Sequence, residues 1–381
     1  RRDVTAVDVS RLTLDAIAHA LPDSTTALIE FVTGRGSQPT SAIVITRRTS
    51  YALQLVPIDS LRDDIARLLA VIQSDRLDSV GNSRIGNALL ANALRRLPPG
   101  VRELVIVPED ALYRLPFAAL RVDGHRLVER YAVHVAPSAA VALALWAERR
   151  PPGPARMLAF GNPRFPLDDS PDPPATRAHF AAFASNGCLS RLPASASEAQ
   201  AAARFFPRSL ALVGEAASES NLKRARLDQF RLIHFATHAQ VDERAPGRTA
   251  IALAAGGGED GFVTSSDLGA LDLNADLVML SGCSTALGLI VGGEGILGLT
   301  GPLLQAGSHS VVATLWPVSD RGSAEFVESF YRYLSSGMPA ADALRAAQLN
   351  AIQRGALLRD WAAFELTGDG FVRLSPSATS H

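Results

Sequence analysis

The sequence predicts an α/β protein with a mostly parallel sheet flanked by helices. Short apolar runs alternate with longer amphipathic segments, as strands and helices do in this fold class. Two of the runs, Leu277–Ser281 and Ser310–Leu315, are apolar nearly throughout, which is typical of strands covered on both faces by helices. With 381 residues, 47% of them hydrophobic, the chain is long enough for two lobes with a substantial core.

In the first half of the chain, the apolar runs have the length of strands and the periodic segments have the length of helices. The prolines at 151, 152 and 154 break this pattern, and we interpret them as the boundary between an N-terminal lobe (1–150) and a second lobe (151–381). The predicted strands are Ala27–Val32, Ala42–Thr46, Tyr51–Val56 (a hairpin with the one before it), Glu103–Val107 and Tyr131–Val135, and the predicted helices are Leu61–Gln73, Gly86–Leu97 and Ala139–Arg149.

The second half repeats the alternation after a proline-dotted stretch, Pro163–Pro193, which we expect to be a long surface loop with one short helix. The predicted strands are Arg156–Gly161, Leu210–Val213, Arg231–Ala236, Thr249–Leu253, Leu277–Ser281 and Ser310–Leu315, and the predicted helices are Ser197–Phe206, Ser218–Leu227, Ile296–Gln305, Gly322–Ser335 and Ala340–Gln353.

Composition narrows the class of function. A net charge of −1 leaves no basic surface of the kind that binds nucleic acid directly. Two cysteines cannot form a disulfide framework, which indicates a reducing, cytoplasmic location. Residues 295–319 are uncharged, but glycines and Pro302 interrupt them, so we expect a soluble protein that does not enter a membrane. The chain starts at Arg1 without a methionine or a signal segment, which suggests a piece of a longer, non-exported protein.

Two residues that can do chemistry follow predicted strands. The strand at 231–236 leads to His238, and the strand at 277–281 leads to Cys283. In open α/β sheets, functional groups gather at the carboxyl ends of the strands, and a cysteine beside an imidazole is a good nucleophile at neutral pH. We therefore predict a catalytic dyad of His238 and Cys283, with the backbone N–H groups of Ala239 and Cys283 as oxyanion donors.

Other interpretations compete with the dyad. A lone cysteine or histidine is more often a buried structural residue, but the order and spacing of this pair are similar to those of caspases. His234 and His238 are too far apart on a strand, roughly 13 Å, to share a metal ion. The pattern G-x-G-x-x-G at Gly293–Gly298 does not follow a strand directly, so we expect a flexible loop that enters a packed helix. Cys188 lies in the irregular loop and is interpreted as incidental.

Several segments carry a resemblance to a known family, namely Leu104–Leu120, Leu127–Ser138, Leu192–Glu198, Ile233–Ala239, Ala275–Gly288, Gly293–Gly301, Val311–Asp320 and Trp361–Gly368. From about residue 25 to 370, the chain resembles the CHAT family, caspase-like cysteine peptidases that are related to separase and often follow tetratricopeptide repeats. Gly282 and Ser284 stand where that family typically has alanine and glutamate, and neither change touches the dyad.

The resemblance implies a caspase-like, mostly parallel sheet flanked by helices in the second lobe and a degenerate pseudo-caspase lobe before it. It implies cleavage of a protein substrate by His238 and Cys283. Related separases recognise a basic residue before the cleaved bond, so an acidic residue is expected in the S1 pocket. Asp320, which we expect at the end of the strand that follows Cys283, is the first candidate, and Glu294 is the second. The other interpretation of Asp320 is an N-cap for the helix that starts near Gly322.

The resemblance also implies control by an upstream tetratricopeptide-type or other sensor region, in bacterial defence or programmed cell death. The loop at 163–193 is a candidate regulatory or self-cleavage segment. Two other functions remain open: a non-catalytic caspase-like docking module, and a nucleotide-binding domain built on Gly293–Gly298. No cofactor or metal is expected, because the chain has no zinc-type cysteine and histidine spacing.

Overall fold

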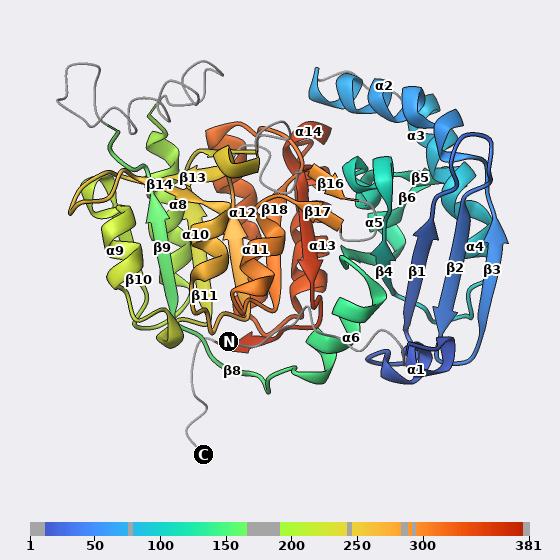
Figure 1. Cartoon of the computed structure of the whole chain (residues 1–381), viewed down its shortest axis with the longest axis horizontal. Helices are drawn as coiled ribbons and strands as arrows, with labels where there is room; N and C mark the ends of the chain where they lie inside the picture. The colour runs from blue at the N-terminus through green and yellow to red at the C-terminus, as the bar shows by residue number, and fades with distance from the viewer. Residues whose placement is uncertain are drawn as a thin grey trace.

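The computed structural model describes residues 12–74, 79–165, 191–241, 246–282, 289–291 and 295–375. Its centre is an eleven-stranded sheet with the strand order β10-β9-β11-β15-β18-β19-β7-β4-β1-β2-β3 (Figure 1). All neighbouring strands in this sheet run parallel except for the pairs β18–β19, β1–β2 and β2–β3. The predicted α/β fold with a mostly parallel sheet is therefore confirmed.

The first half of the chain supplies one end of the sheet. β1 (Thr26–Val32), β4 (Glu103–Val107) and β7 (Ala132–Val135) are parallel, and β2 (Ser41–Thr46) and β3 (Ser50–Gln54) extend them as an antiparallel hairpin. Every residue of β4 is buried, which explains its run of Leu, Val and Ile. In β3, exposed and half-buried residues alternate, because this strand forms the edge of the sheet.

The second half supplies the other end. β9 (Met157–Gly161), β11 (Leu232–Ala236), β15 (Leu277–Leu280) and β18 (Ser310–Thr314) are buried along their whole length, and β10 (Leu210–Val213) forms the partly exposed edge. These strands begin and end within one residue of their predicted bounds, because apolar runs covered on both faces are easily recognised.

β19 (Phe364–Gly368) joins the two halves, since it lies between β18 and β7. This strand was not predicted from the sequence. Just beyond it, the guanidinium of Arg149 makes two bonds, of 2.9 and 3.0 Å, to the fully buried carboxylate of Asp369. The two predicted lobes thus share one continuous sheet, and their boundary at residue 150 stays a prediction.

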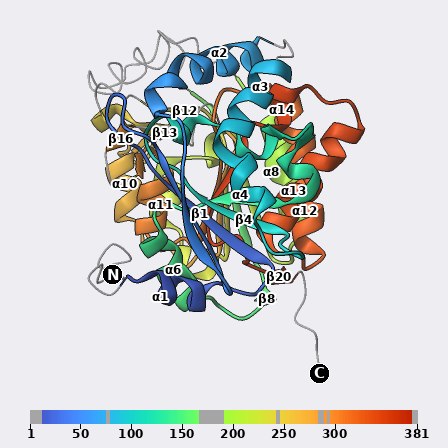
Figure 2. The ribbon, with the colours of Figure 1, turned by 90° about the vertical axis from the view of Figure 1, so that its right-hand side faces the viewer.

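Helices cover both faces of the sheet. Figure 2 shows α8 (Pro193–Arg204), α12 (Asp320–Ser335) and α13 (Ala340–Gln353) on one face, with α10 (Ser265–Ala270) and α11 (Thr300–Gln305) on the other. The helix α12 packs inward through apolar residues at helical spacing. These residues are Phe326, Val327, Phe330, Tyr331 and Leu334.

One predicted helix is wrong over its first residues. The segment Ile296–Gln305 was expected to be helical throughout, but β16 (Leu289–Val291) and β17 (Gly295–Leu297) form an antiparallel hairpin, and α11 begins only at Thr300. The proline at 302 fits the first turn of a helix, where its missing N–H costs nothing, and this agrees with the later start.

The other predicted elements were found with shifted bounds, together with short elements that were not predicted. The predicted helix at 86–97 is a longer run of α3 (Ser79–Gly86), a π-helical turn (Asn87–Ala91) and α4 (Asn92–Arg95). The remaining elements are α1 (Leu14–Ala20), α2 (Arg62–Gln73), α5 (Leu127–Arg130), α6 (Ala139–Ala147), α9 (Glu219–Arg224), α14 (Leu358–Trp361), β5 (Arg121–Val122), β6 (His125–Arg126), β8 (Gly153–Pro154), β12 (Ala239–Gln240), β13 (Ala250–Ala252), β14 (Phe262–Thr264) and β20 (Leu374–Ser375).

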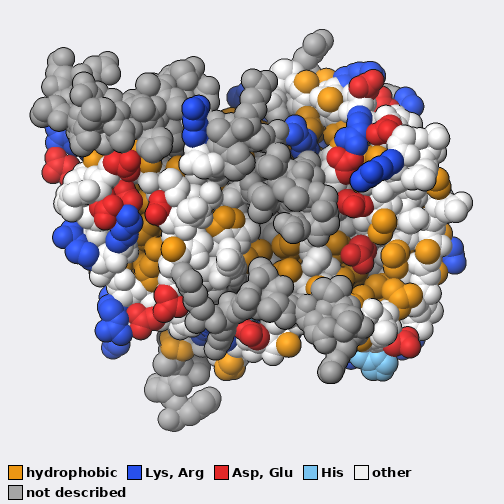
Figure 3. All heavy atoms as spheres, viewed as in Figure 1, with side chains coloured by type: hydrophobic (Ala, Val, Ile, Leu, Met, Phe, Trp, Pro, Cys, Tyr) orange, Lys and Arg blue, Asp and Glu red, His pale blue; other side chains and the backbone are white. Residues whose placement is uncertain are grey.

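The described surface mixes charges of both signs. On the face shown in Figure 3, basic and acidic side chains lie next to one another over both halves of the molecule. None of the described helices is long and apolar enough to cross a membrane.

Candidate functional site

The candidate site lies where β11 and β15 end side by side. The two strands pair in parallel, and the N–H of Ser281 donates to the backbone of β11 at 3.1 Å. The segments that follow the two strands also stay close together. A Cβ on Gly282 would overlap the carbonyl oxygen of Thr237. Only glycine permits so close an approach without a shift of the backbone. The residue before His238 therefore touches the residue before Cys283.

Several predicted residues lie outside the described part of the chain, namely Cys283, Glu294 and Cys188, together with most of the loop at 163–193. The described chain at the end of β15 stops at Gly282, whose carbonyl oxygen accepts a hydrogen bond from the hydroxyl of Thr314 in β18. A neighbouring strand therefore holds the last residue before Cys283 in place.

His238 follows β11 and is buried. Its carbonyl oxygen accepts a hydrogen bond from the N–H of Ala252 in β13 at 2.8 Å, and its ring packs against that of Phe165 with 5.7 Å between the ring centres. Thr237 adds a bond from its hydroxyl to the carbonyl of Ala252. The backbone of the histidine is thus fixed by the small sheet of β12, β13 and β14.

Ala239, the predicted oxyanion donor, is the first residue of β12. It lies opposite Ile251 in β13. The adjacent pair of this ladder, His238 opposite Ala252, is the hydrogen-bonded one. In an antiparallel ladder, the residue next to a hydrogen-bonded pair turns its N–H away from the partner strand. The N atom of Ala239 lies beside Gly282, at 3.3 Å from where a Cβ of that glycine would be. The register therefore leaves this N–H free of β13 and next to the turn that leads to Cys283.

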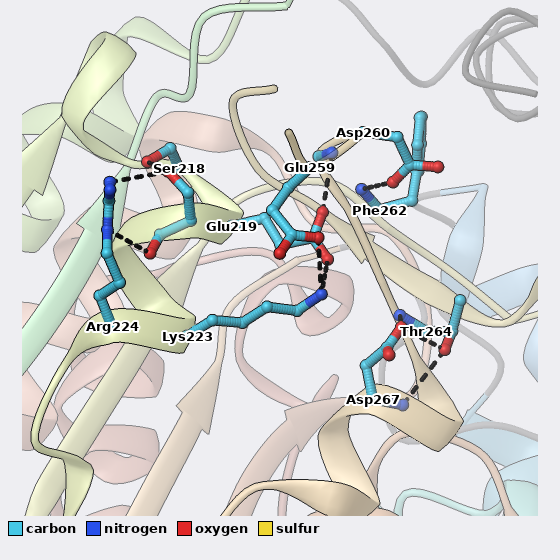
Figure 4. A network of polar contacts seen from close by, with 11 residues as sticks. Ser218, Glu219, Lys223, Arg224, Glu259, Asp260, Phe262, Thr264 and Asp267 are labelled. Carbon is cyan, nitrogen blue, oxygen red and sulfur yellow. Dashed lines mark hydrogen bonds and ion pairs between the residues drawn. The ribbon is translucent and has the colours of Figure 1, made fainter. Parts of the chain in front are cut away.

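The hairpin of β13 and β14 supports the backbone of the histidine. β13 and β14 are joined through Gly256–Gly258, which have positive φ and form the tip of the hairpin. Figure 4 shows how the hairpin is tied to α9: Lys223 contacts the carboxylates of Glu219 and Glu259 at 2.8 and 2.7 Å. Glu219 also accepts a hydrogen bond from the N–H of Gly261 at 2.8 Å. Lys223 is the only lysine of the chain.

Asp320 lies close to the strand ends, although its place differs from the predicted one. It does not end a strand, and it is not an N-cap, because Ser319 caps α12 and Asp320 is the first residue of that helix. One carboxylate oxygen accepts a hydrogen bond from the N–H of Ala194 at the start of α8, at 2.8 Å. Asp320 and Gly282 line the same small cavity of about 30 Å³.

A buried polar cluster that was not predicted adjoins this cavity, which Glu198 and Ser281 also line. It contains Glu198 of α8, His234 of β11 and Tyr331 of α12, and it reaches the end of β15 through Ser281. The sequence offered one signal, since Glu198 closes one of the segments that resemble the CHAT family. Within the described ranges, no group of three His, Cys, Asp or Glu side chains is arranged to hold a metal ion.

This architecture, with a histidine and the approach to a cysteine at neighbouring strand ends of a mostly parallel sheet, defines a caspase-like α/β fold. A comparison with protein families identifies the particular family. The CHAT domain matches residues 82–369, and the chain therefore belongs to the CHAT domain family.

Two curated relatives are similar in sequence, and both are named tetratricopeptide repeat protein 28. The human protein is 26% identical over an alignment of 322 residues, which covers 73% of this chain and 12% of the relative. The mouse protein is 34% identical over 120 residues, which are 31% of this chain and 5% of the relative. The chain thus spans only a small part of the length of these relatives.

The fold is shared with separase, and a second solved structure gives a lower score. The separase–securin complex of Saccharomyces cerevisiae superimposes with a TM-score of 0.59 at 12% identity, over 93% of this chain and 30% of that chain. A complex of the pro- and mature domains of RgpB from Porphyromonas gingivalis gives a TM-score of 0.44 at 8% identity, over 83% of this chain and 77% of that chain. At such identities, the likeness to separase is one of fold alone.

Proposed function

We propose that this chain is a cysteine endopeptidase domain in which Cys283 is the nucleophile and His238 the general acid and base. The observation that carries the proposal is the contact between Thr237 and Gly282, the residues that precede the two members of the dyad. Two functional groups held at neighbouring strand ends of a rigid sheet are oriented for joint chemistry.

The proposed reaction has two stages. The sulfur of Cys283 attacks the scissile carbonyl, while the N–H groups of Ala239 and Cys283 stabilise the oxyanion. His238 protonates the leaving amine, and it then accepts a proton from the water that hydrolyses the acyl-enzyme.

The dyad is tested with a library of fluorogenic peptides. Cys283→Ala and His238→Ala should each abolish cleavage, whereas Cys188→Ala and a change of the exposed histidine, His125→Ala, should leave it unchanged. Cleavage that survives Cys283→Ala would contradict the assignment. If the wild-type chain neither cleaves any peptide nor reacts with an electrophilic peptide label, the alternative of a non-catalytic docking module is favoured.

We further propose that the S1 pocket prefers Arg or Lys and that Asp320 supplies the negative charge, with Glu294 as the second candidate. Support comes from the position of Asp320 on the cavity beside Gly282 and from the bond to Ala194, which holds its carboxylate in one orientation. A fixed carboxylate can bind a guanidinium with little loss of entropy.

The variant Asp320→Asn tests this pocket, because the amide oxygen can still accept the bond from Ala194 while the charge is lost. We expect it to reduce cleavage after Arg and Lys and to leave cleavage after neutral residues unchanged. A preference of the wild-type domain for acidic residues would refute the pocket.

In the complete protein, we propose that this domain acts in the cytoplasm on a protein substrate, and that the first half of the sheet is an inactive relative of the second. The names of both curated relatives support a tetratricopeptide-type sensor region in the same polypeptide. Regulated proteolysis in defence or programmed cell death is the corresponding setting. It is tested by asking whether cleavage by the complete protein depends on its repeat region.

A further inference from the structure

The buried cluster beside the candidate site draws side chains from three elements. His234 in β11 is fully buried between Glu198 of α8 and Tyr331 of α12. Its Nε2 atom lies 3.1 Å from a carboxylate oxygen of Glu198, and its Nδ1 atom lies 3.2 Å from the hydroxyl of Tyr331. Glu198 and Tyr331 are themselves buried. A helix on each side of His234 is thereby tied to the strand that leads to His238.

The cluster also reaches the second strand of the site. The hydroxyl of Ser281, which follows β15, donates to the same Oε1 atom of Glu198 that faces His234, at 2.5 Å. Ser281 is separated from Cys283 only by Gly282. One carboxylate oxygen therefore contacts groups on both chain segments that carry the proposed dyad.

The protonation of the cluster suits this arrangement. Burial and the nearby carboxylate of Glu198 raise the pKa of Tyr331 well above its ordinary value, so its hydroxyl stays protonated and can donate to Nδ1 of His234. Glu198 thus accepts a hydrogen bond from the end of β15 through Ser281, while the ring of His234 in β11 lies against the same carboxylate.

Stability alone does not account for such a cluster. Replacing buried polar groups by apolar groups of similar shape is often neutral or stabilising, because their desolvation is costly. Polar contacts of this kind are useful where geometry must be specified, as in the supporting residues around a reactive group.

We propose that Glu198 is a positioning residue of the peptidase site, which holds the end of β15 through Ser281 and so directs Cys283 toward His238. The inference deepens the proposed function and rests on it. In this role Glu198 acts on the dyad through Ser281 and not by contact with the reacting atoms.

The decisive variant is Ser281→Ala, because it removes one hydroxyl and leaves the core otherwise filled. Its matched control is Ser308→Ala, which removes a buried hydroxyl that donates to the carbonyl of Ser310 at the other end of β18. Ser281→Thr keeps a hydroxyl at this position and is expected to retain the kcat that Ser281→Ala loses. All variants are made in a Cys188→Ala background, so that Cys283 is the only thiol.

Two readouts separate positioning from a structural role. On the best peptide of the fluorogenic library, Ser281→Ala should lower kcat by about tenfold to a hundredfold, with KM nearly unchanged, since misplacement of a reacting group affects the chemical step. The rate of alkylation of Cys283 by iodoacetamide should also change. Its pH midpoint should rise toward about 8.5, the value of an ordinary thiol, because the imidazole no longer supports the thiolate.

Glu198 is tested directly by a pair of variants. Glu198→Gln keeps an oxygen that can accept from Ser281, whereas Glu198→Ala does not, so the glutamine variant should retain more kcat than the alanine variant. If Glu198→Ala does not fold, the comparison of Ser281→Ala with Ser308→Ala still tests the positioning role.

The outcomes distinguish this inference from the function on which it rests. Equal kcat and equal alkylation profiles for Ser281→Ala and Ser308→Ala would overturn the positioning role while Cys283→Ala still abolishes cleavage. Cleavage that persists in Cys283→Ala would instead refute the proposed function itself.

Discussion

Glu365 is the second residue of β19, the strand that joins the two halves of the sheet. It keeps a little exposed surface, but burial still raises its pKa to about 8. The unfolded chain would ionise it near 4.5. Between these two values the folded state holds a proton that the unfolded state releases, so this residue makes the protein less stable as the pH rises.

We expect Glu365→Gln, which cannot titrate, to remove that contribution. Relative to the wild type, its free energy of unfolding should rise between pH 5 and pH 8 by at most about 1.4 kcal/mol per pH unit. Urea unfolding at several pH values measures this difference. The control is Glu328→Gln, an exposed glutamate of α12 paired with Arg332. A constant difference between Glu365→Gln and wild type over this range would show that Glu365 is ionised in the folded protein.

At the scale of elements, the short β13–β14 hairpin supports the candidate site, because β13 fixes the backbone of His238. Its attachment to α9 depends on Lys223, which lies between two carboxylates (Figure 4). One of them, Glu219, is almost fully buried, and burial raises its pKa. Loosening this attachment should therefore also loosen the backbone of His238 at the candidate site.

The variant Lys223→Met leaves Glu219 without its cation, and we expect a loss of about 1–3 kcal/mol of unfolding free energy, because a buried carboxylate then lacks a counter-charge. Hydrogen exchange at the N–H of Gly261, which donates to Glu219, should become faster. Arg226→Met serves as the control, since its pair with Asp228 is exposed. Unchanged exchange in Lys223→Met would mean that other contacts attach the hairpin.

The elements also show what could be predicted from the sequence. The bounds of β11, β15 and β18 were predicted to within one residue, because buried parallel strands are continuous apolar runs. β19 was missed because Glu365 interrupts its apolar pattern, and β17 was assigned to a helix because its short apolar segment runs into α11.

The site was predictable only in part, for a related reason. His238 and Ala239 could be placed because each follows a recognisable strand. The contact of Glu198 with His234 and Ser281 could not, because residues distant in sequence meet only when α8 packs on the sheet. Patterns along the chain report the nearest neighbours of a residue but not such tertiary partners.

At the scale of the whole molecule, the pair Arg149–Asp369 connects the end of the first half to the strand that closes the sheet. Asp369 is fully buried and Arg149 is mostly covered, with its guanidinium also stacked on Phe371. The carboxylate depends on this single guanidinium for both of the bonds described above.

We expect Arg149→Ala to cost about 3–5 kcal/mol of unfolding free energy, since it leaves a buried carboxylate without a cation, and Arg149→Lys to cost less. Arg332→Ala, which removes an exposed pair in α12, should cost less than about 1 kcal/mol. Chemical unfolding measures all three. Equal losses for Arg149→Ala and Arg332→Ala would show that the two halves are held together by the sheet and its core without help from this pair.

The position of β19 between β18 and β7 has a consequence for biosynthesis. It is the last strand of the large sheet in chain order, yet it occupies the middle. While the chain is still being made on a ribosome, β18 and β7 each lack a neighbour until residue 368 has emerged. Unpaired strands of this kind can pair with other chains, so nascent copies of this protein should need protection from one another until the last strand inserts.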